Sequence, residues 1–276
     1  MEYLYAVFMG LLQGVTEFLP VSSSGHLSLF QNFFGGKEPD NLFNVLLHFA
    51  TLLAVCVVYR KDIWQMILEF FRGLRALASP GSRKGRVPPA RRLVWMVILG
   101  TLPLFIVLPF KDKVEALGGS TLFIGCALLV TGLLLFASDR FARCQKTERT
   151  MTAADALLIG CGQALAVVPG LSRSGTTITA GVARGLDRPF AVRYSFLLSL
   201  PAVLGATLLE VLDVVKDGVN ATLIPQYLVG MVVAAVSGYF AIGLVKLLAD
   251  KGKFGAFAYY CWAAGILAIL ATLLLK

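Results

Sequence analysis

Two short polar segments, each rich in serine and glycine, lie inside stretches of the chain that are otherwise apolar. The first runs over residues 13–26 and the second over residues 163–176. In each, a Gln is followed by a short apolar run, a Pro and a Ser-x-Ser-Gly turn, so the two align with a one-residue gap. Irregular, hydroxyl-rich backbone at membrane depth is tolerated only where it is buried in protein or lines a watery cavity. The repetition therefore indicates a duplicated element and one polar site within a bilayer.

The composition agrees with a membrane setting. Of the 276 residues, 57% are hydrophobic and only 15% are charged, and the mean hydropathy is +0.77. Soluble domains are less apolar and carry more charge. The chain opens on Met1, Glu2 and Tyr3 without a basic region, so we expect no cleaved signal peptide. We predict an all-α polytopic integral membrane protein.

Six apolar runs are long enough to cross a bilayer as helices, which takes about 20 residues. They cover residues 42–59, 93–110, 121–137, 194–212, 223–248 and 254–275. The two serine-rich segments interrupt further apolar stretches. Each is predicted to form a re-entrant helix-loop-helix, over residues 3–34 and 153–188. Residues 63–78 have apolar side chains at helical spacing and are predicted to lie at the membrane interface.

Basic residues in the connections predict the orientation, because cytoplasmic loops carry an excess of Lys and Arg. The connections at 60–92, 140–149, 184–193 and 246–253 are basic, whereas those at 111–119 and 210–220 mix Lys with acidic residues. Placing the basic connections in the cytoplasm divides the single membrane domain, 1–276, into two inverted repeats, 1–140 and 150–276. The first re-entrant segment then dips from outside and the second from the cytoplasm, and they meet near the midplane.

The first segment begins with a polar pair at helical spacing. Gln13 and Glu17 are four residues apart and share one face of a helix. Glu17, beside hydroxyl groups, is a candidate for binding a divalent cation or for handling a proton. The alternative is an interfacial carboxylate that is hydrogen-bonded to a neighbouring helix. His48, inside an expected span, is assigned no role.

The serine cluster follows directly after Pro20. Ser22, Ser23, Ser24, Gly25 and His26 combine three hydroxyls, a flexible residue and an imidazole. This composition suits oxyanion binding and supplies a nucleophile. The alternative is a helix-capping serine cluster with an incidental histidine.

The second segment contains an arginine at predicted membrane depth. Arg173 is flanked by hydroxyl residues, namely Ser172, Ser174, Thr176 and Thr177. A buried guanidinium needs a partner, and its donors fit phosphate oxygens well. Backbone amides after the glycines, at the start of a following helix, would add to a phosphate cradle. The alternative is a fixed ion pair between Arg173 and Glu17 that holds the two halves together.

Several other functions lack support in the sequence. The five cysteines lie singly, without the spacing of a zinc site or a disulfide framework. Neither Gly-rich segment has the Gly-Lys-Ser/Thr of a phosphate-binding loop, so nucleotide hydrolysis is unsupported. The formal charge of +9 is concentrated in the connections, where it suits lipid headgroups and topology rather than nucleic acid.

The two motifs together resemble the undecaprenyl pyrophosphate phosphatase family of bacterial inner membranes, also called bacitracin-resistance proteins. They read Gln-x-x-x-Glu-Phe-Leu-Pro-Val-Ser-Ser-Ser-Gly-His and Pro-Gly-x-Ser-Arg-Ser-Gly-x-Thr-Ile. The resemblance covers essentially the whole chain. It implies removal of the terminal phosphate of undecaprenyl pyrophosphate to recycle the lipid carrier for cell-wall synthesis. It also implies an active site that opens to the outer face and a divalent cation, Mg or Ca.

The resemblance also implies site residues. The expected catalytic residues are Glu17, Ser23, His26 and Arg173, with Glu17 as the cation ligand. The expected substrate-binding residues are Gln13, Ser22, Ser24, Gly25, Ser172, Ser174, Gly175 and Thr177. The family position that is often acidic is a Gln here, at Gln13, and a neutral amide cannot be a general base.

The mechanism suggested has Ser23 attack the terminal phosphorus while Glu17 and His26 handle protons and Arg173 stabilises charge. The motif leaves open whether Ser23 or His26 is phosphorylated. A transporter or lipid flippase is the main rival, because broken helices that meet at the midplane also suit anion transport. A lipid phosphatase of the acid-phosphatase type is discarded, since Thr179 stands where its histidine would be. Membrane lipids are expected partners, and a homodimer is compatible with the sequence.

Overall fold

The computed structural model describes residues 3–34, 41–78, 87–140, 145–217 and 221–274, and these segments contain helices but no strands. The α-helices are α1 (Tyr3–Phe18), α2 (Ser23–Phe34), α3 (Asn41–Val58), α4 (Arg60–Ala78), α5 (Pro89–Thr101), α6 (Leu104–Val107), α7 (Lys111–Glu115), α8 (Thr121–Ser138), α9 (Ala153–Leu165), α10 (Arg173–Ala183), α11 (Arg188–Asp217), α12 (Ile224–Lys251) and α13 (Gly255–Leu274). Short 3₁₀ turns are η2 (Leu108–Phe110), η3 (Ala116–Gly119) and η4 (Ala221–Leu223).

Five helical stretches in the described chain are long and apolar enough to cross a membrane. They are Pro89–Gly119, Thr121–Ser138, Arg188–Leu209, Ile224–Lys251 and Gly255–Leu274. A sixth is reached if the bent pair of α3 and α4 counts as one span. The predicted class, a polytopic helical membrane protein, is therefore confirmed. Leu275, the last residue of the last predicted span, lies outside the described residues.

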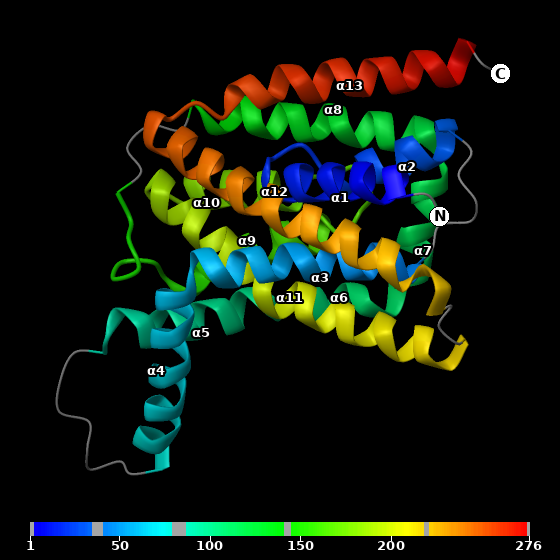
Figure 1. Cartoon of the computed structure of the whole chain (residues 1–276). Helices are drawn as coiled ribbons and strands as arrows, with labels where there is room; N and C mark the ends of the chain where they lie inside the picture. The colour runs from blue at the N-terminus through cyan, green and yellow to red at the C-terminus, as the bar shows by residue number, and fades with distance from the viewer. Residues whose placement is uncertain (1–2, 35–40, 79–86, 141–144, 218–220, 275–276) are drawn as a thin grey trace.

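The first predicted span ends in a sharp bend. Helix α4 turns by 85° from α3, and in Figure 1 it projects away from the long helices. Apolar side chains along α4 are exposed, including Trp64, Ile67 and Phe71. A helix with such a face suits the surface of a bilayer, as predicted for residues 63–78.

The predicted span over 93–110 is not one uniform helix. Helix α5 ends at Thr101, α6 begins after a short break, and at Leu108 it passes directly into the 3₁₀ turn η2. Pro103 lies at the break before α6, and Pro109 lies within η2. Proline lacks a backbone N–H and crowds the preceding turn, so it interrupts a helix that hydropathy alone makes continuous.

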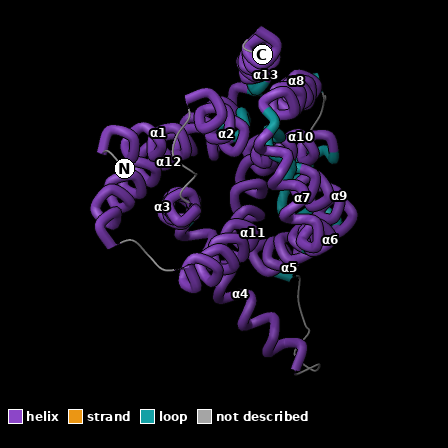
Figure 2. Tube along the Cα trace, turned by 90° about the vertical axis from the view of Figure 1, so that its right-hand side faces the viewer, coloured by secondary structure: helices purple, strands orange, loops and turns teal. Residues whose placement is uncertain are grey.

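Figure 1 shows the long helices running side by side, with both termini at the same end of the bundle and α4 at the other. Helix α1 packs along α12, and α8 packs along α13. Helix α3 lies between α11 and α12, while α5 and α6 pack against α9. The view along the bundle in Figure 2 shows the same arrangement, with α1, α3 and α12 on one side and α5, α6 and α9 on the other.

Glycines permit the closest of these helix crossings. A Cβ on Gly10 of α1 would lie 2.4 Å from the carbonyl oxygen of Gly230 on α12. A Cβ on Gly160 of α9 would lie 2.3 Å from that of Gly100 on α5. Small residues let backbones approach and are typical of packing between membrane helices. The two crossings occupy matching places in the two predicted repeats, although the division at 1–140 and 150–276 stays a prediction.

Candidate active site

The two serine-rich segments adopt the same local structure. Each is a helix, a tight turn and a second helix whose first turn is capped by the first serine of Ser-x-Ser-Gly. The amide of Gly25 donates to Ser22 Oγ at 3.2 Å, and the amide of Gly175 donates to Ser172 Oγ at 3.0 Å. A serine at the N-cap satisfies an amide that the helix leaves unpaired. The capping alternative given for the first serine cluster therefore holds for the Ser22 hydroxyl, and Ser172 makes the equivalent bond in the second segment.

The turn before α2 carries an unusual backbone conformation. Ser22 has a φ of 72°, the one positive value at a non-glycine position in the described chain. Its side chain is buried, with 3% exposed. Such conformations cost free energy and persist where the surroundings impose them, often at functional sites. The strained turn brings Ser23 to the first position of α2.

The two turns pack directly against each other. A Cβ on Gly25 would lie 3.0 Å from Gly170 Cα, and one on Gly175 would lie 3.3 Å from Pro20 Cβ. Ser174 Oγ also donates to the carbonyl oxygen of Leu19 at 3.3 Å. The first segment therefore meets the second at the centre of the bundle, and the small size of both glycines allows the approach.

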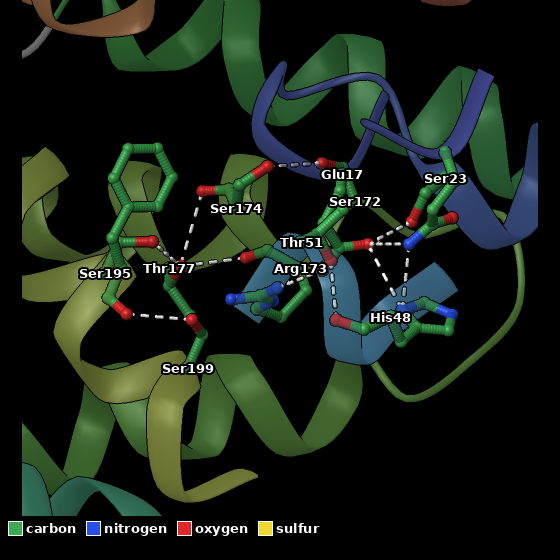
Figure 3. A network of polar contacts seen from close by, with 12 residues as sticks. Glu17, Ser23, His48, Thr51, Ser172, Arg173, Ser174, Thr177, Ser195 and Ser199 are labelled. Atoms are coloured by element: carbon green, nitrogen blue, oxygen red, sulfur yellow. Dashed lines mark hydrogen bonds and ion pairs between the residues drawn. The ribbon is translucent and has the colours of Figure 1, made fainter. Parts of the chain in front are cut away.

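A carboxylate from the first segment and a guanidinium from the second form the core of the site (Figure 3). Arg173 Nη2 donates to Glu17 Oε1. Ser23 Oγ donates to the other carboxylate oxygen, Oε2, at 2.7 Å. The side chains of Glu17 and Arg173 are 7% and 18% exposed. The ion pair between Arg173 and Glu17, given as an alternative from the sequence, is present in the structure. Ser23, the predicted nucleophile, is hydrogen-bonded to the same carboxylate.

Gln13 hydrogen-bonds to this cluster and links it to His48, a histidine to which the sequence assigned no role. Gln13 Nε2 donates to Glu17 Oε2 at 3.0 Å and to His48 Nδ1 at 2.9 Å. His48 Nδ1 is 3.6 Å from Glu17 Oε2. His48 lies on α3, far from either motif, and no local pattern marks it. Its contact with Gln13 arises only when α3 packs against α1.

The hydroxyls of Ser172, Ser174 and Thr177 have partners within the protein, whereas Thr176 Oγ1 is buried without one in the described residues. Thr177 Oγ1 donates to the carbonyl oxygen of Arg173 at 2.8 Å and is 2.6 Å from Ser195 Oγ. Ser172 Oγ caps α10, and Ser174 Oγ reaches the first segment. These side chains brace the backbone that carries Arg173. Their predicted contact with substrate stays a prediction, as it does for Ser24, whose hydroxyl is 3.4 Å from Ser22 Oγ.

His26 is held apart from the carboxylate. Its Nδ1 donates to the carbonyl oxygen of Ser22 at 2.7 Å, and its Nε2 is 2.7 Å from Tyr260 Oη. The two rings stack, with their centroids 5.6 Å apart. In the described chain, no hydrogen bond joins His26 to Glu17, Ser23 or Arg173. The structure therefore brings together Gln13, Glu17, Ser23 and Arg173 and places His26 beside them on α2.

Two buried polar atoms in the cluster of Gln13, Glu17 and Arg173 have no partner in the described part of the chain. They are Nη1 of Arg173, a donor, and Oε1 of Gln13, an acceptor. Buried polar atoms are nearly always paired in native proteins, so each exception needs an explanation. A bound phosphate would satisfy the guanidinium, and a donor or cation would satisfy the amide oxygen.

The residues available for a cation are few. Among the described residues, no three His, Cys, Asp or Glu side chains are grouped as metal ligands. Glu17 and the unpaired Oε1 of Gln13 supply a carboxylate and an amide oxygen at the site. Mg²⁺ commonly uses one or two protein oxygens and completes its shell with substrate phosphates and water. The donor set fits a cation bound in that way.

The sequence is similar to proteins of one family along its whole length. The model of the family described as bacitracin resistance protein BacA matches residues 6–267. The undecaprenyl-diphosphatase of Halothermothrix orenii is 38% identical over 271 residues, which cover 98% of each chain. That of Methanobrevibacter smithii is 40% identical over 99% of each chain, and that of Syntrophotalea carbinolica is 42% identical over 96% of this chain and 97% of its own. The chain therefore belongs to the bacitracin resistance protein BacA family.

Proposed function

We propose that this protein is an undecaprenyl pyrophosphate phosphatase. It hydrolyses the terminal phosphate of the lipid and yields undecaprenyl phosphate and inorganic phosphate. Relatives that match nearly the full chain carry the name undecaprenyl-diphosphatase. The product is the lipid carrier that cell-wall synthesis reuses, and bacitracin resistance is the property for which the family is named.

The observation that carries this proposal is the contact of Ser23 with Glu17 and Arg173. A hydroxyl that donates to a carboxylate is arranged to lose its proton as it attacks. The guanidinium on the other carboxylate oxygen fixes the orientation of Glu17. A simple anion transporter would need the arginine but would have no use for a serine joined to a base.

In the first step, Ser23 Oγ attacks the terminal phosphorus and its proton passes to Glu17 Oε2. The bond from this phosphorus to the bridging oxygen breaks, and the departing undecaprenyl phosphate keeps the electron pair. Glu17 then gives the proton to the departing phosphate. The unpaired Nη1 of Arg173 is a donor for the phosphoryl oxygens, whose charge grows in the transition state.

In the second step, water replaces undecaprenyl phosphate and attacks the phosphorylated Ser23. Glu17 accepts a proton from the water, the bond between phosphorus and Ser23 Oγ breaks, and Ser23 takes this proton from Glu17. Inorganic phosphate leaves, and the resting site is restored. His26 as a second proton carrier stays a prediction, since its ring is paired with Ser22 and Tyr260.

A divalent cation, Mg or Ca, belongs to the same proposal. When bound, such a cation neutralises charge on the pyrophosphate and on the phosphoryl group during transfer. Glu17 and the carbonyl oxygen of Gln13 would hold it from the protein side. Gln13 contributes a neutral oxygen, so the protein supplies one negative charge to the cation instead of two.

The location and orientation of the protein in the cell are also part of the proposal. We infer that the chain lies in the inner membrane of a bacterium, with the basic connections in the cytoplasm and the site open to the outer face. Ser22, Ser24, Gly25 and Gly175 line the two turns that would face the pyrophosphate. Association into a homodimer remains compatible with this arrangement.

Phosphate release from undecaprenyl pyrophosphate by purified protein in detergent tests the proposal. We expect release that rises with added Mg or Ca and falls with a chelator. Arg173→Ala should lower the rate by about 10²- to 10³-fold, as loss of a donor to transition-state charge usually does. Arg140→Ala is the matched control, because Arg140 lies at the end of α8 over the Phe136 ring. A folded, monodisperse wild-type protein without release would favour the transporter instead.

A further inference from the structure

His48 occupies a position at the candidate active site that neither serine-rich motif contains. It lies on α3, with its side chain 34% exposed, and its Nδ1 accepts a hydrogen bond from the Gln13 amide. The same amide nitrogen donates to Glu17 Oε2. Gln13 is completely buried. The histidine is thus joined to the reacting groups through one side chain.

We propose that His48 is a positioning residue, which orients the Gln13 amide and through it the carboxylate that activates Ser23. An amide group has a donor end and an acceptor end, and turning it over exchanges them. In the observed orientation, its two N–H groups point at two acceptors, His48 Nδ1 and Glu17 Oε2. The opposite orientation would place Oε1 against both acceptors.

The hydrogen bond from Gln13 to His48 Nδ1 fixes the orientation of the amide. With Glu17 alone as a partner, one N–H of a buried amide would lose its hydrogen bond, which costs about 1–3 kcal/mol. The amide could then rotate to regain a partner, and Glu17 Oε2 would lose its donor. Since Oε2 also accepts the hydrogen bond of Ser23, the nucleophile would lose alignment. Residues that orient the groups directly involved in chemistry commonly change activity by about 10- to 100-fold.

The hydrogen bonds also assign the two imidazoles of the chain to opposite tautomers. His48 accepts at Nδ1, so in its neutral form the proton is on Nε2. His26 donates from Nδ1 to the Ser22 carbonyl oxygen, so its proton is on Nδ1 and its Nε2 accepts from Tyr260. The chain has two histidines in all, and the two tautomers can therefore be observed separately.

The spectroscopic test uses protein labelled with ¹⁵N-histidine, in detergent, at a pH at which both rings are neutral. We expect one ring protonated at Nδ1 and one at Nε2, with the Nδ1 signal lost in His26→Gln. Gln13→Ala should change the His48 signal and leave that of His26 in place. A His48 ring protonated at Nδ1, or one that is indifferent to Gln13→Ala, would overturn the proposal. This test does not depend on enzymatic activity, so it stands even if the proposed phosphatase function fails.

The kinetic test rests on the proposed function and uses a double-mutant cycle. We expect His48→Ala to lower kcat/KM by about 10- to 100-fold, and His48→Asn, whose amide oxygen can replace Nδ1 as acceptor, to restore most of it. Because His48 acts through Gln13, the double variant His48→Ala with Gln13→Ala should be no worse than Gln13→Ala alone. Losses that multiply in the double variant would contradict the proposal. Cys56→Ala, elsewhere on α3, is the control for a general effect on the helix.

Discussion

At the scale of single residues, the site depends on one carboxylate that serves several partners. Glu17 accepts hydrogen bonds from Gln13, Ser23 and Arg173, and its side chain is 7% exposed. A buried charge with several donors is held in one orientation, which favours a reaction that needs a fixed base. The neutral amide at Gln13 means that no second carboxylate on α1 shares this task.

Glu17→Gln keeps the size of the side chain and removes the base. We expect kcat to fall by about 10²- to 10⁴-fold, the usual contribution of a general base. Arg173 would also lose its partner, so the melting temperature should fall as well. Phosphate release and thermal unfolding in detergent measure the two effects. Glu115→Gln, at the exposed end of α7, is the control, and an active Glu17→Gln enzyme would contradict the assigned role.

Sequence reasoning selected candidate residues within the motifs and gave no role to the residues that contact them from elsewhere in the chain. Glu17, Ser23 and Arg173 stand in polar segments that are conspicuous against apolar surroundings. His48 lies in an apolar span, and Tyr260 lies 234 residues from His26. Their contacts arise from helix packing, for which a single sequence gives no local signal.

At the scale of elements, close helix crossings fix where the two turns meet. Helix α9 approaches α5 at Gly160 and Gly100, and α1 approaches α12 at Gly10 and Gly230. Helices α1 and α9 lead directly into the turns that carry the site. Their depth in the bundle therefore sets the distance between Glu17 and Arg173.

Gly160→Ala tests this role of the crossings. The added Cβ would lie 2.3 Å from the Gly100 carbonyl oxygen, so α9 must shift. Overpacking of this kind costs about 1–3 kcal/mol, and we expect a lower melting temperature and reduced phosphate release. Gly205→Ala on α11 is the matched control, because a Cβ there meets nothing within 4 Å. Equal stability of the two variants would refute the importance of the crossing.

Hydropathy could not predict where the helices are interrupted. The apolar run over 93–110 has the composition of one span, yet α5 ends at Thr101 before Pro103. The helix-turn-helix form of both polar segments, in contrast, followed from Pro20 and Pro169 and from the Ser-x-Ser-Gly turns. Local chemistry was informative where proline and serine determine the backbone.

At the scale of the whole molecule, the charges of the connections predict which ends of the helices face the two sides of the membrane. Helix α8 separates Gly119 from Arg149, so the two residues lie at opposite ends of a span. A cysteine at position 119 is sterically tolerated, since a Cβ on Gly119 meets nothing within 4 Å. The basic connection around Arg149 is predicted to be cytoplasmic.

Labelling in intact cells with a membrane-impermeant maleimide tests this orientation. In a background without the native cysteines, Gly119→Cys should react directly. Arg149→Cys should react only after the membrane is permeabilised. The parent protein without cysteines is the control, and the reverse pattern would invert the topology and place the site open to the cytoplasm.

The most direct test of the central claim, that Ser23 is the nucleophile and Glu17 its base, is to trap the phosphorylated enzyme. Purified protein is mixed with undecaprenyl pyrophosphate labelled in its terminal phosphate, quenched within a turnover and mapped by peptide analysis, beside Ser23→Ala. We expect an acid-stable label on Ser23 that forms before inorganic phosphate appears and that is absent from the variant. An acid-labile label on His26, or normal phosphate release by Ser23→Ala, would contradict it.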